Sequence, residues 1–121
     1  MNKRVIGDNY EKVAIHYLQS KGYTILETNF RAGRFGEIDI IARDSKGLLI
    51  ICECKYRKNE NCENPLSAVD YTKQRQISRT TLFYYSKNGY GYDYPCRFDV
   101  IGIYGDGRIQ HIENAFNFIG N

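Results

Sequence analysis

The sequence contains no tryptophan, one methionine and two prolines, and it lacks any long apolar run. The longest uninterrupted apolar stretch, at 48–52, is far shorter than the roughly 20 residues that a membrane-spanning helix needs. The basic residues near the start are followed by no apolar segment, which argues against a secretory signal peptide. We therefore expect a cytoplasmic protein.

Repeats, low-complexity tracts and Pro/Ser linkers are also missing. With 121 residues, of which 42% are hydrophobic and 26% charged, the chain has the length and composition of one folded domain. Its 17 Lys and Arg against 14 Asp and Glu give a formal net charge of +3. This charge is compatible with a polyanionic partner but does not require one.

Cysteine is sparse, with four residues at positions 52, 54, 62 and 96. Without an export signal, a disulfide framework is a poor interpretation. Cys52 and Cys54 fall on one face of a predicted strand, so a zinc site is one alternative. Their spacing is not the C-x-x-C of zinc sites, however, and small buried side chains explain the pair more simply.

The hydrophobic pattern predicts two helices and five strands. Apolar residues recur at helical spacing over about 5–20 and again after Pro65, with Asn64 as the expected N-cap. Strands are expected at 23–29, 36–43, 48–56, 97–104 and 108–112, with a polar loop at 57–64 and a final turn at 114–118. The order helix, three strands, helix, two strands predicts an α/β domain with a mixed β-sheet.

Charged residues follow or interrupt two of these strands. The apolar run at 48–52 has the pattern of a strand buried on both faces, yet it leads directly into Glu53 and Lys55. These two side chains lie two residues apart and therefore share one face. Glu37 and Asp39 share a face of the preceding strand in the same way. Four charges on two apolar strands indicate a site.

The hairpin between these strands predicts which charges meet. If its loop has three residues, with a glycine at the last position, paired residue numbers sum to 92. Asp39 then lies opposite Glu53, and Glu37 lies opposite Lys55. A two-residue loop would instead place Asp39 opposite Cys52. The predicted carboxylate pair therefore depends on the loop length.

Two adjacent carboxylates repel, and a divalent cation relieves that repulsion. Oxygen ligands suit Mg²⁺ or Mn²⁺ rather than zinc. The simpler alternative is a surface salt bridge of Lys55, but such pairs contribute only about 0 to 1 kcal/mol. Glu11 lies at the edge of the inward apolar stripe of the first helix, and Lys73 lies within that of the second helix. They could point into the site, or be a solvated carboxylate and a snorkelling lysine.

The order of these residues resembles a nuclease signature. Glu11, Gly36-Glu37-Ile38-Asp39 and Glu53-Cys54-Lys55 resemble the D-x(n)-E-x-K pattern of the PD-(D/E)-x-K superfamily. Nearly the whole chain is similar to the YraN family of predicted endonucleases, related to archaeal Holliday-junction resolvases. The resemblance extends to Arg97-Phe98-Asp99-Val100 and to His111-Ile112 with Asn114-Ala115-Phe116. It implies a restriction-endonuclease-like α/β fold, a mixed β-sheet flanked by helices.

The resemblance also implies a role for each matching residue. Asp39 and Glu53 would hold Mg²⁺ or Mn²⁺ together with the main-chain carbonyl of Cys54. Lys55 would orient the attacking water and stabilise charge on the phosphate. Two departures from the family pattern are Ile38, where the superfamily name has proline, and Cys54, where relatives more often have an aliphatic residue.

Further roles follow from the same resemblance. Glu11 would support the metal site, and Glu37 occupies a family position without an agreed role. Contacts to the substrate backbone would come from Arg31, Arg34, Arg57, Lys58, Lys73 and Arg75. The expected protein is a metal-dependent endonuclease of DNA, with branched or otherwise structured DNA as its substrate, acting as a homodimer. The alternative is a nucleic-acid or protein binding module that kept the fold and lost turnover.

Overall fold

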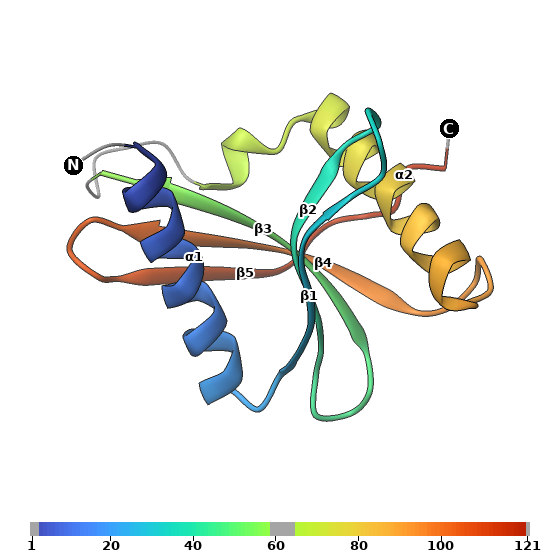
Figure 1. Ribbon diagram of the computed structural model, residues 1–121, viewed down its shortest axis with the longest axis horizontal. Helices are drawn as coiled ribbons and strands as arrows, with labels where there is room; N and C mark the ends of the chain where they lie inside the picture. Colours follow the sequence, from blue (N-terminus) through green and yellow to red (C-terminus); the bar gives the residue numbers. More distant parts are fainter. Residues whose placement is uncertain (1–2, 59–64, 121) are drawn as a thin grey trace.

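The computed structural model describes residues 3–58 and 65–120 (Figure 1). Its elements are, in chain order, α1 (Lys3–Ser20), β1 (Thr24–Arg31), β2 (Glu37–Arg43), β3 (Leu49–Arg57), the 3₁₀ helix η1 (Pro65–Ala68), α2 (Tyr71–Asn88), β4 (Cys96–Tyr104) and β5 (Ile109–Phe116). The predicted order of helices and strands is confirmed. None of the helices in the described part of the chain has the length and apolar character needed to cross a membrane.

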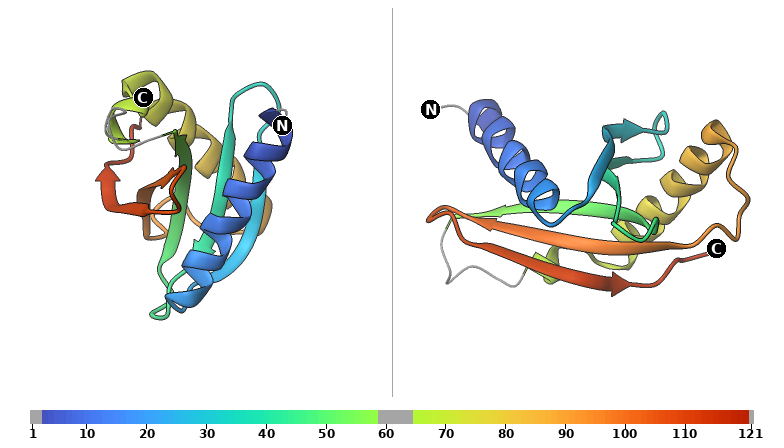
Figure 2. Two further views of the ribbon diagram at one scale, coloured as in Figure 1. Left: turned by 90° about the vertical axis from the view of Figure 1, so that its left-hand side faces the viewer. Right: turned by 90° about the horizontal axis from the view of Figure 1, so that it is seen from below.

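The five strands form one sheet in the order β1-β2-β3-β4-β5. Neighbouring strands are antiparallel except for β3 and β4, which are parallel. A parallel pair needs a crossover connection, and α2 lies on that connection. The two helices lie on opposite faces of the sheet, as the views in Figure 2 show. The predicted mixed sheet flanked by helices is confirmed.

Each helix closes a separate apolar core. Ala14 and Leu18 of α1 pack on one face of the sheet, where Cys52 and Cys54 are also buried. On the other face, Ile77 of α2 packs with strand residues that alternate with the first set. Because β3 is covered on both faces, its apolar residues are continuous rather than alternating.

The second helix begins later than the sequence indicates. Pro65 opens η1, and α2 starts at Tyr71 after the N-cap Asp70, whose side chain accepts a hydrogen bond from the backbone N of Lys73 at 2.9 Å. The predicted N-cap Asn64 lies outside the described residues, as does Cys62. Proline fits the first turn of either kind of helix, so its presence did not distinguish them. The carboxylate cap of Asp70 determines where the α-helix begins.

The last strand is longer than predicted. It continues through Phe116, so the expected turn at 114–118 is wrong for its first three residues. Asn114 adopts a left-handed conformation, with φ of 53°, where the pairing with β4 shifts register. A bulge of this kind interrupts the alternation of side chains without ending the strand.

Candidate functional site

The β2–β3 hairpin has the predicted three-residue loop. Gly47 has a φ of 90°, and the backbone N of Asp44 donates to the carbonyl of Leu48 at 2.9 Å. Paired residue numbers in the ladder sum to 92, and the last pair at the far end is Ile40 with Cys52. The predicted register is therefore confirmed.

Asp39 and Glu53 follow that last pair, where the two strands diverge (Figure 1). Asp39 Oδ2 accepts a hydrogen bond from the backbone N of Cys54 at 2.8 Å. A side-chain carboxylate thus replaces a backbone carbonyl as the partner of β3. This contact brings the Asp39 carboxylate beside Glu53, as the sequence predicts.

Glu53 is only 5% exposed and lies between two lysines. Its Oε1 atom is 3.4 Å from Lys55 Nζ on the same strand and 3.8 Å from Lys73 Nζ in the first turn of α2. Its Oε2 atom is buried and accepts no hydrogen bond within the described parts of the chain. A buried polar atom without a partner costs roughly 1–3 kcal/mol. Glu53 therefore has one oxygen paired with ammonium groups and one oxygen available for a ligand.

Asp39 has an altered affinity for protons. Burial, together with the negative charge of Glu53, raises the pKa of its carboxyl group to about 7. The hydrogen bond from Cys54 opposes both effects. Two carboxylates in one place cannot both ionise easily. At neutral pH, the Asp39 carboxyl group is therefore close to its own pKa.

Glu11 and Glu37 meet at Asn29 of β1. With its amide nitrogen facing the carboxylates, Asn29 donates to Glu11 Oε1 at 3.2 Å and to Glu37 Oε1 at 3.0 Å. Asn29 has a φ of 52°, a conformation that asparagine tolerates better than most residues. Glu37 also lies 3.6 Å from Arg31 Nη2, its ladder partner in β1. The expected pairing of Glu37 with Lys55 is replaced by this contact, because the β2–β3 ladder ends before reaching them.

The sequence interpretation missed one residue beside the carboxylates, Tyr10 of α1. Its ring stacks on Tyr56 with centroids 5.7 Å apart. Burial raises the pKa of Tyr10 to about 12, and the negative charge of Asp39 contributes. In the sequence, Tyr10 belongs to the apolar stripe of the first helix, so no local signal distinguishes it from a core residue.

The basic residues predicted to contact a substrate occupy three segments around the carboxylates. They lie at the end of β1 and the following turn (Arg31, Arg34), at and after the end of β3 (Arg57, Lys58) and in the first turns of α2 (Lys73, Arg75). Most are exposed, while Arg57 is half-buried and Lys73 reaches Glu53. Of these cations, Arg31 lies 3.6 Å from Glu37 and Lys73 lies 3.8 Å from Glu53, although 42 positions separate Arg31 from Lys73 in the sequence.

The donor set suits a hard divalent cation. Within residues 3–58 and 65–120, no group of three or more His, Cys, Asp and Glu side chains could hold a metal ion. Mg²⁺ commonly takes only one or two carboxylates, with water or phosphate completing its shell. Such a cation would give the Glu53 oxygen that has no partner among the described residues a ligand contact. It would also offset the repulsion that raises the pKa of Asp39. Asp39 and Glu53 therefore fit Mg²⁺ or Mn²⁺.

The zinc alternative does not fit the structure. Cys52 and Cys54 are buried in the apolar core beneath α1, on the opposite face of β3 from Glu53. Burial raises the pKa of both thiols well above the ordinary value, whereas a zinc ligand must lose its proton. These cysteines pack as small hydrophobic residues.

A second buried carboxylate, Asp99 of β4, has the opposite character. Arg97 donates to both of its oxygens at 2.8 Å, and His111 Nε2 and the backbone N of Asn114 lie at 2.7 and 3.0 Å. Burial favours a higher pKa, but these hydrogen bonds outweigh it and lower the pKa of Asp99. Tyr17 of α1 contacts His111 at 3.0 Å. With its oxygens occupied, Asp99 joins β4 and β5 to α1.

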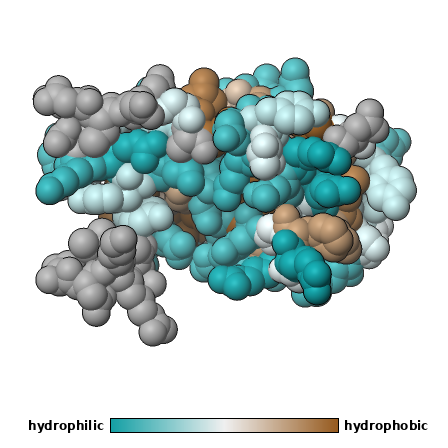
Figure 3. All heavy atoms as spheres, turned by 90° about the horizontal axis from the view of Figure 1, so that it is seen from above, coloured by the Kyte–Doolittle hydropathy of each residue, from teal (hydrophilic) through white to brown (hydrophobic). Residues whose placement is uncertain are grey.

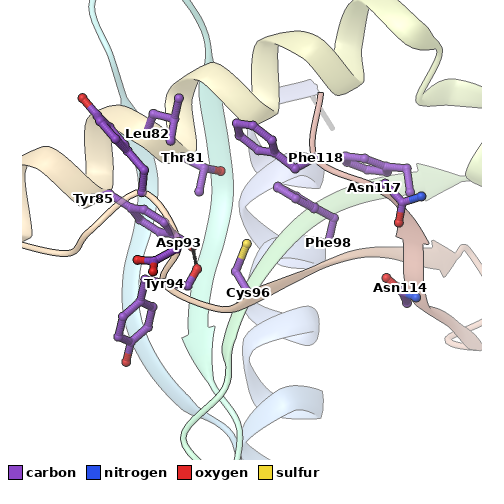
Figure 4. Close-up of a pocket in the computed structure, with 12 residues that line it drawn as sticks. Thr81, Leu82, Tyr85, Asp93, Tyr94, Cys96, Phe98, Asn114, Asn117 and Phe118 are labelled. Atoms are coloured by element: carbon purple, nitrogen blue, oxygen red, sulfur yellow. Dashed lines mark hydrogen bonds between the residues drawn. The ribbon is translucent and has the colours of Figure 1, made fainter. Parts of the chain in front are cut away.

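A cavity of about 260 Å³ lies apart from the carboxylate pair, between α2, the start of β4 and the end of β5. Figure 4 shows Thr81 and Tyr85 of α2 on one side and Cys96 and Phe98 of β4 on the other. None of the predicted site residues lines it. The candidate site is therefore the carboxylate pair at the open end of the hairpin.

The family follows from comparison with known sequences. A profile of the uncharacterised protein family UPF0102 matches residues 10–103. The chain belongs to this family. Its resemblance to YraN proteins is thereby confirmed. The UPF0102 chain is 50% identical over 111 residues to a UPF0102 protein of Thermodesulfovibrio yellowstonii, covering 92% of this chain and 95% of the relative. It is 42% identical over 121 residues to one from Lachnoclostridium phytofermentans, covering all of both chains.

Solved structures show a more distant likeness. The UPF0102 chain matches a chain in the structure of the EndoMS–dsDNA2 complex with a TM-score of 0.40 and 20% identity, over 78% of this chain and 34% of that one. It matches the crystal structure of SSO0001 with a TM-score of 0.45 and 17% identity, over 91% and 50% of the two chains. The UPF0102 chain thus spans between a third and half of these proteins.

Proposed function

We propose that this UPF0102 protein is a nuclease that uses Mg²⁺ or Mn²⁺ to hydrolyse phosphodiester bonds in DNA. The observation that carries the proposal is the pair Asp39 and Glu53. One buried Glu53 oxygen has no hydrogen-bond partner among the described residues, while two lysines adjoin the other oxygen. A merely structural ion pair gains nothing from leaving a buried oxygen unsatisfied. A cation site that adjoins two lysines suits an anionic substrate.

Asp39 and Glu53 would hold the cation, with the main-chain carbonyl of Cys54 as a third ligand and Glu11 in support. The two carboxylates come from strands joined by a short hairpin, so their spacing is maintained by the ladder behind them. Glu11 is tied to Glu37 through Asn29, which keeps that carboxylate on the same side of the sheet edge. When bound, the cation supplies charge that polarises a phosphate and lowers the pKa of water.

Lys55 and Lys73 would act on the substrate. Without a cation, their ammonium groups compensate Glu53 across 3.4 and 3.8 Å. With a divalent cation bound at Asp39 and Glu53, the ammonium groups of Lys55 and Lys73 would be available to interact with phosphate. Lys55 would orient the attacking water and offset the negative charge that develops on the phosphate oxygens. Lys73, one helical turn into α2, would approach from the other side.

DNA is the proposed partner because the site is surrounded by exposed cations. Arg31, Arg34, Arg57, Lys58 and Arg75 lie on three segments that border the carboxylates. Phosphate contacts of this kind position a nucleic acid without reading its sequence. Branched or otherwise structured DNA is the proposed substrate, and a homodimer with two sites is the proposed assembly.

The test is cleavage of a labelled DNA panel comprising duplex, junction, flap and single strands, with Mg²⁺, Mn²⁺ or EDTA. Wild type should cleave only with metal, Lys55→Ala should not cleave, and Lys46→Ala, which changes an exposed lysine in the β2–β3 loop, should retain cleavage as the control. An RNA strand of matched sequence tests the choice of DNA. Binding that survives Lys55→Ala, with no cleavage by wild type under any metal, would instead identify a binding module.

A further inference from the structure

Two exposed phenylalanines form a stacked pair beside the site. Phe35, in the turn between β1 and β2, is 45% exposed, and Phe83 of α2 is 46% exposed. Their ring centroids are 5.3 Å apart with an interplanar angle of 24°. The guanidinium carbon of Arg79 lies 5.8 Å from the Phe35 centroid. Two large apolar rings that are half-exposed, with a guanidinium over one of them, indicate a ligand-binding surface.

This surface is preformed by close packing between the turn and the helix. A Cβ atom at Gly36 would lie 2.9 Å from Thr80 Oγ1, so the turn backbone approaches α2 more closely than any side chain allows. Gly36 also has a φ of 154°, which favours glycine. The neighbouring Phe30 ring packs edge-on against Tyr84 with centroids 5.3 Å apart. Phe35 is therefore held on α2 before any ligand arrives.

Cationic side chains predominate around the pair, although Glu37 follows the turn directly and lies 3.6 Å from Arg31. Residues 28–36 and 71–88 contain Arg31, Arg34, Lys73, Arg75, Arg79 and Lys87, and they contain no Asp or Glu. Positions 75, 79 and 83 are four apart and so lie along one side of α2. Figure 3 looks onto the side of the molecule where α2 and the turn lie, and it shows brown hydrophobic spheres among teal hydrophilic ones.

The pair is also continuous with the proposed active site. The turn precedes β2, so Phe35 is four residues from Asp39. Along α2, Lys73 contacts Glu53, and ten residues separate it from Phe83, a rise of about 15 Å. A short nucleic-acid segment at the carboxylates therefore reaches the rings.

We propose that this stacking surface, composed of Phe35, Phe83 and Arg79 with Arg34 and Arg75 beside them, binds an unpaired nucleic-acid base. Aromatic rings in a cationic setting are how proteins hold unstacked bases, because every base has a face to stack. A second copy of the same surface would bring like charges together, which opposes self-association there. Bases inside a duplex are already stacked, so the surface selects flaps, branches or single strands. This inference rests on the proposed function and specifies its substrate class.

The test measures binding in EDTA, so it does not depend on turnover. Two DNAs of equal length carry one 2-aminopurine, either unpaired in a flap or paired in a blunt duplex. Affinity and fluorescence quenching are measured for wild type, Phe35→Leu, Phe83→Leu and Arg79→Gln. The matched control is Phe118→Leu, which removes a ring that is 45% exposed at the separate cavity near the end of the chain. Circular dichroism verifies that each variant is folded.

Phe35→Leu and Phe83→Leu should each bind the flap about tenfold more weakly and lose the quenching, while duplex binding and the Phe118→Leu control change little. Equal losses on flap and duplex, or no loss in folded variants, would overturn the inference. A change in oligomeric state with unchanged DNA affinity would overturn it in favour of a contact between copies. Cleavage of the same flap with Mn²⁺ is measured separately. Flap binding that depends on the rings, without any cleavage, would contradict the proposed nuclease activity and still support the stacking surface.

Discussion

Replacing Asp39 with asparagine should stabilise the metal-free protein at pH 8. Burial, together with the charge of Glu53, raises the pKa of Asp39 to about 7, so at pH 8 the folded protein contains a carboxylate that would be better solvated in the unfolded chain. An amide has nearly the same shape and carries no charge. Its oxygen can still accept the hydrogen bond from the backbone N of Cys54.

The sign and size follow from proton linkage. A raised pKa means that the folded state binds the proton more tightly, so the resulting stability is present below the ordinary pKa of 3.8 and is lost as pH rises through about 7. A shift of about 3 units at about 1.4 kcal/mol per unit bounds the cost at roughly 4 kcal/mol. An amide accepts more weakly than a carboxylate, by roughly 1 kcal/mol. We expect a net gain of at most about 3 kcal/mol at pH 8 and almost none at pH 4.

The assay is urea unfolding of wild type and Asp39→Asn in EDTA at pH 4, 6 and 8, with Asp93→Asn as an exposed control. Adding millimolar Mg²⁺ or Mn²⁺ at pH 8 should stabilise wild type and not Asp39→Asn, because only the carboxylate pair binds the ion in the folded state. A gain that is equal at pH 4 and pH 8 would refute the reasoning. So would an asparagine variant less stable than wild type at pH 8.

Three further outcomes are expected. Lys55→Ala should abolish single-turnover cleavage and leave metal binding measurable by calorimetry, whereas Glu53→Ala should lose both. If Lys55→Ala cleaves at the wild-type rate, Glu53-Cys54-Lys55 is only a structural salt-bridge element. DNA affinity should fall as salt rises, and Lys58→Gln and Arg75→Gln should each lower the slope by about 1 and weaken all sequences alike; a salt-independent affinity would contradict this. Asp99→Asn should cost roughly 3 kcal/mol or more in urea unfolding at pH 7, because it removes the carboxylate that pairs with the largely buried Arg97 guanidinium. The pKa of Asp99 is lowered, so wild type keeps that stability above the ordinary value and loses it as pH falls through the folded pKa; an unchanged midpoint would show that the cluster is dispensable.

The features that the sequence by itself determined depend on residues that are close together in the chain. Side-chain alternation placed Glu53 and Lys55 on one face of β3, and the length of the hairpin loop set the register that brings Asp39 to Glu53. Both depend on a few consecutive residues, because pleat and turn geometry are local. For the same reason the order of helices and strands could be read directly, while their ends could not. The start of α2 depended on a cap at Asp70, which competed with the equally plausible Pro65.

Contacts between distant segments were decided only by the tertiary structure. Lys73 has the pattern of any half-buried helix lysine until the crossover of α2 places it 3.8 Å from Glu53. Glu37 shares a face with Asp39, but the end of the β2–β3 ladder and the pairing with β1 direct it to Arg31. The stacking of Phe35 on a residue 48 positions away likewise leaves no local signal. Burial and charge at these positions are properties of packed surfaces, and packing exists only after the chain has folded.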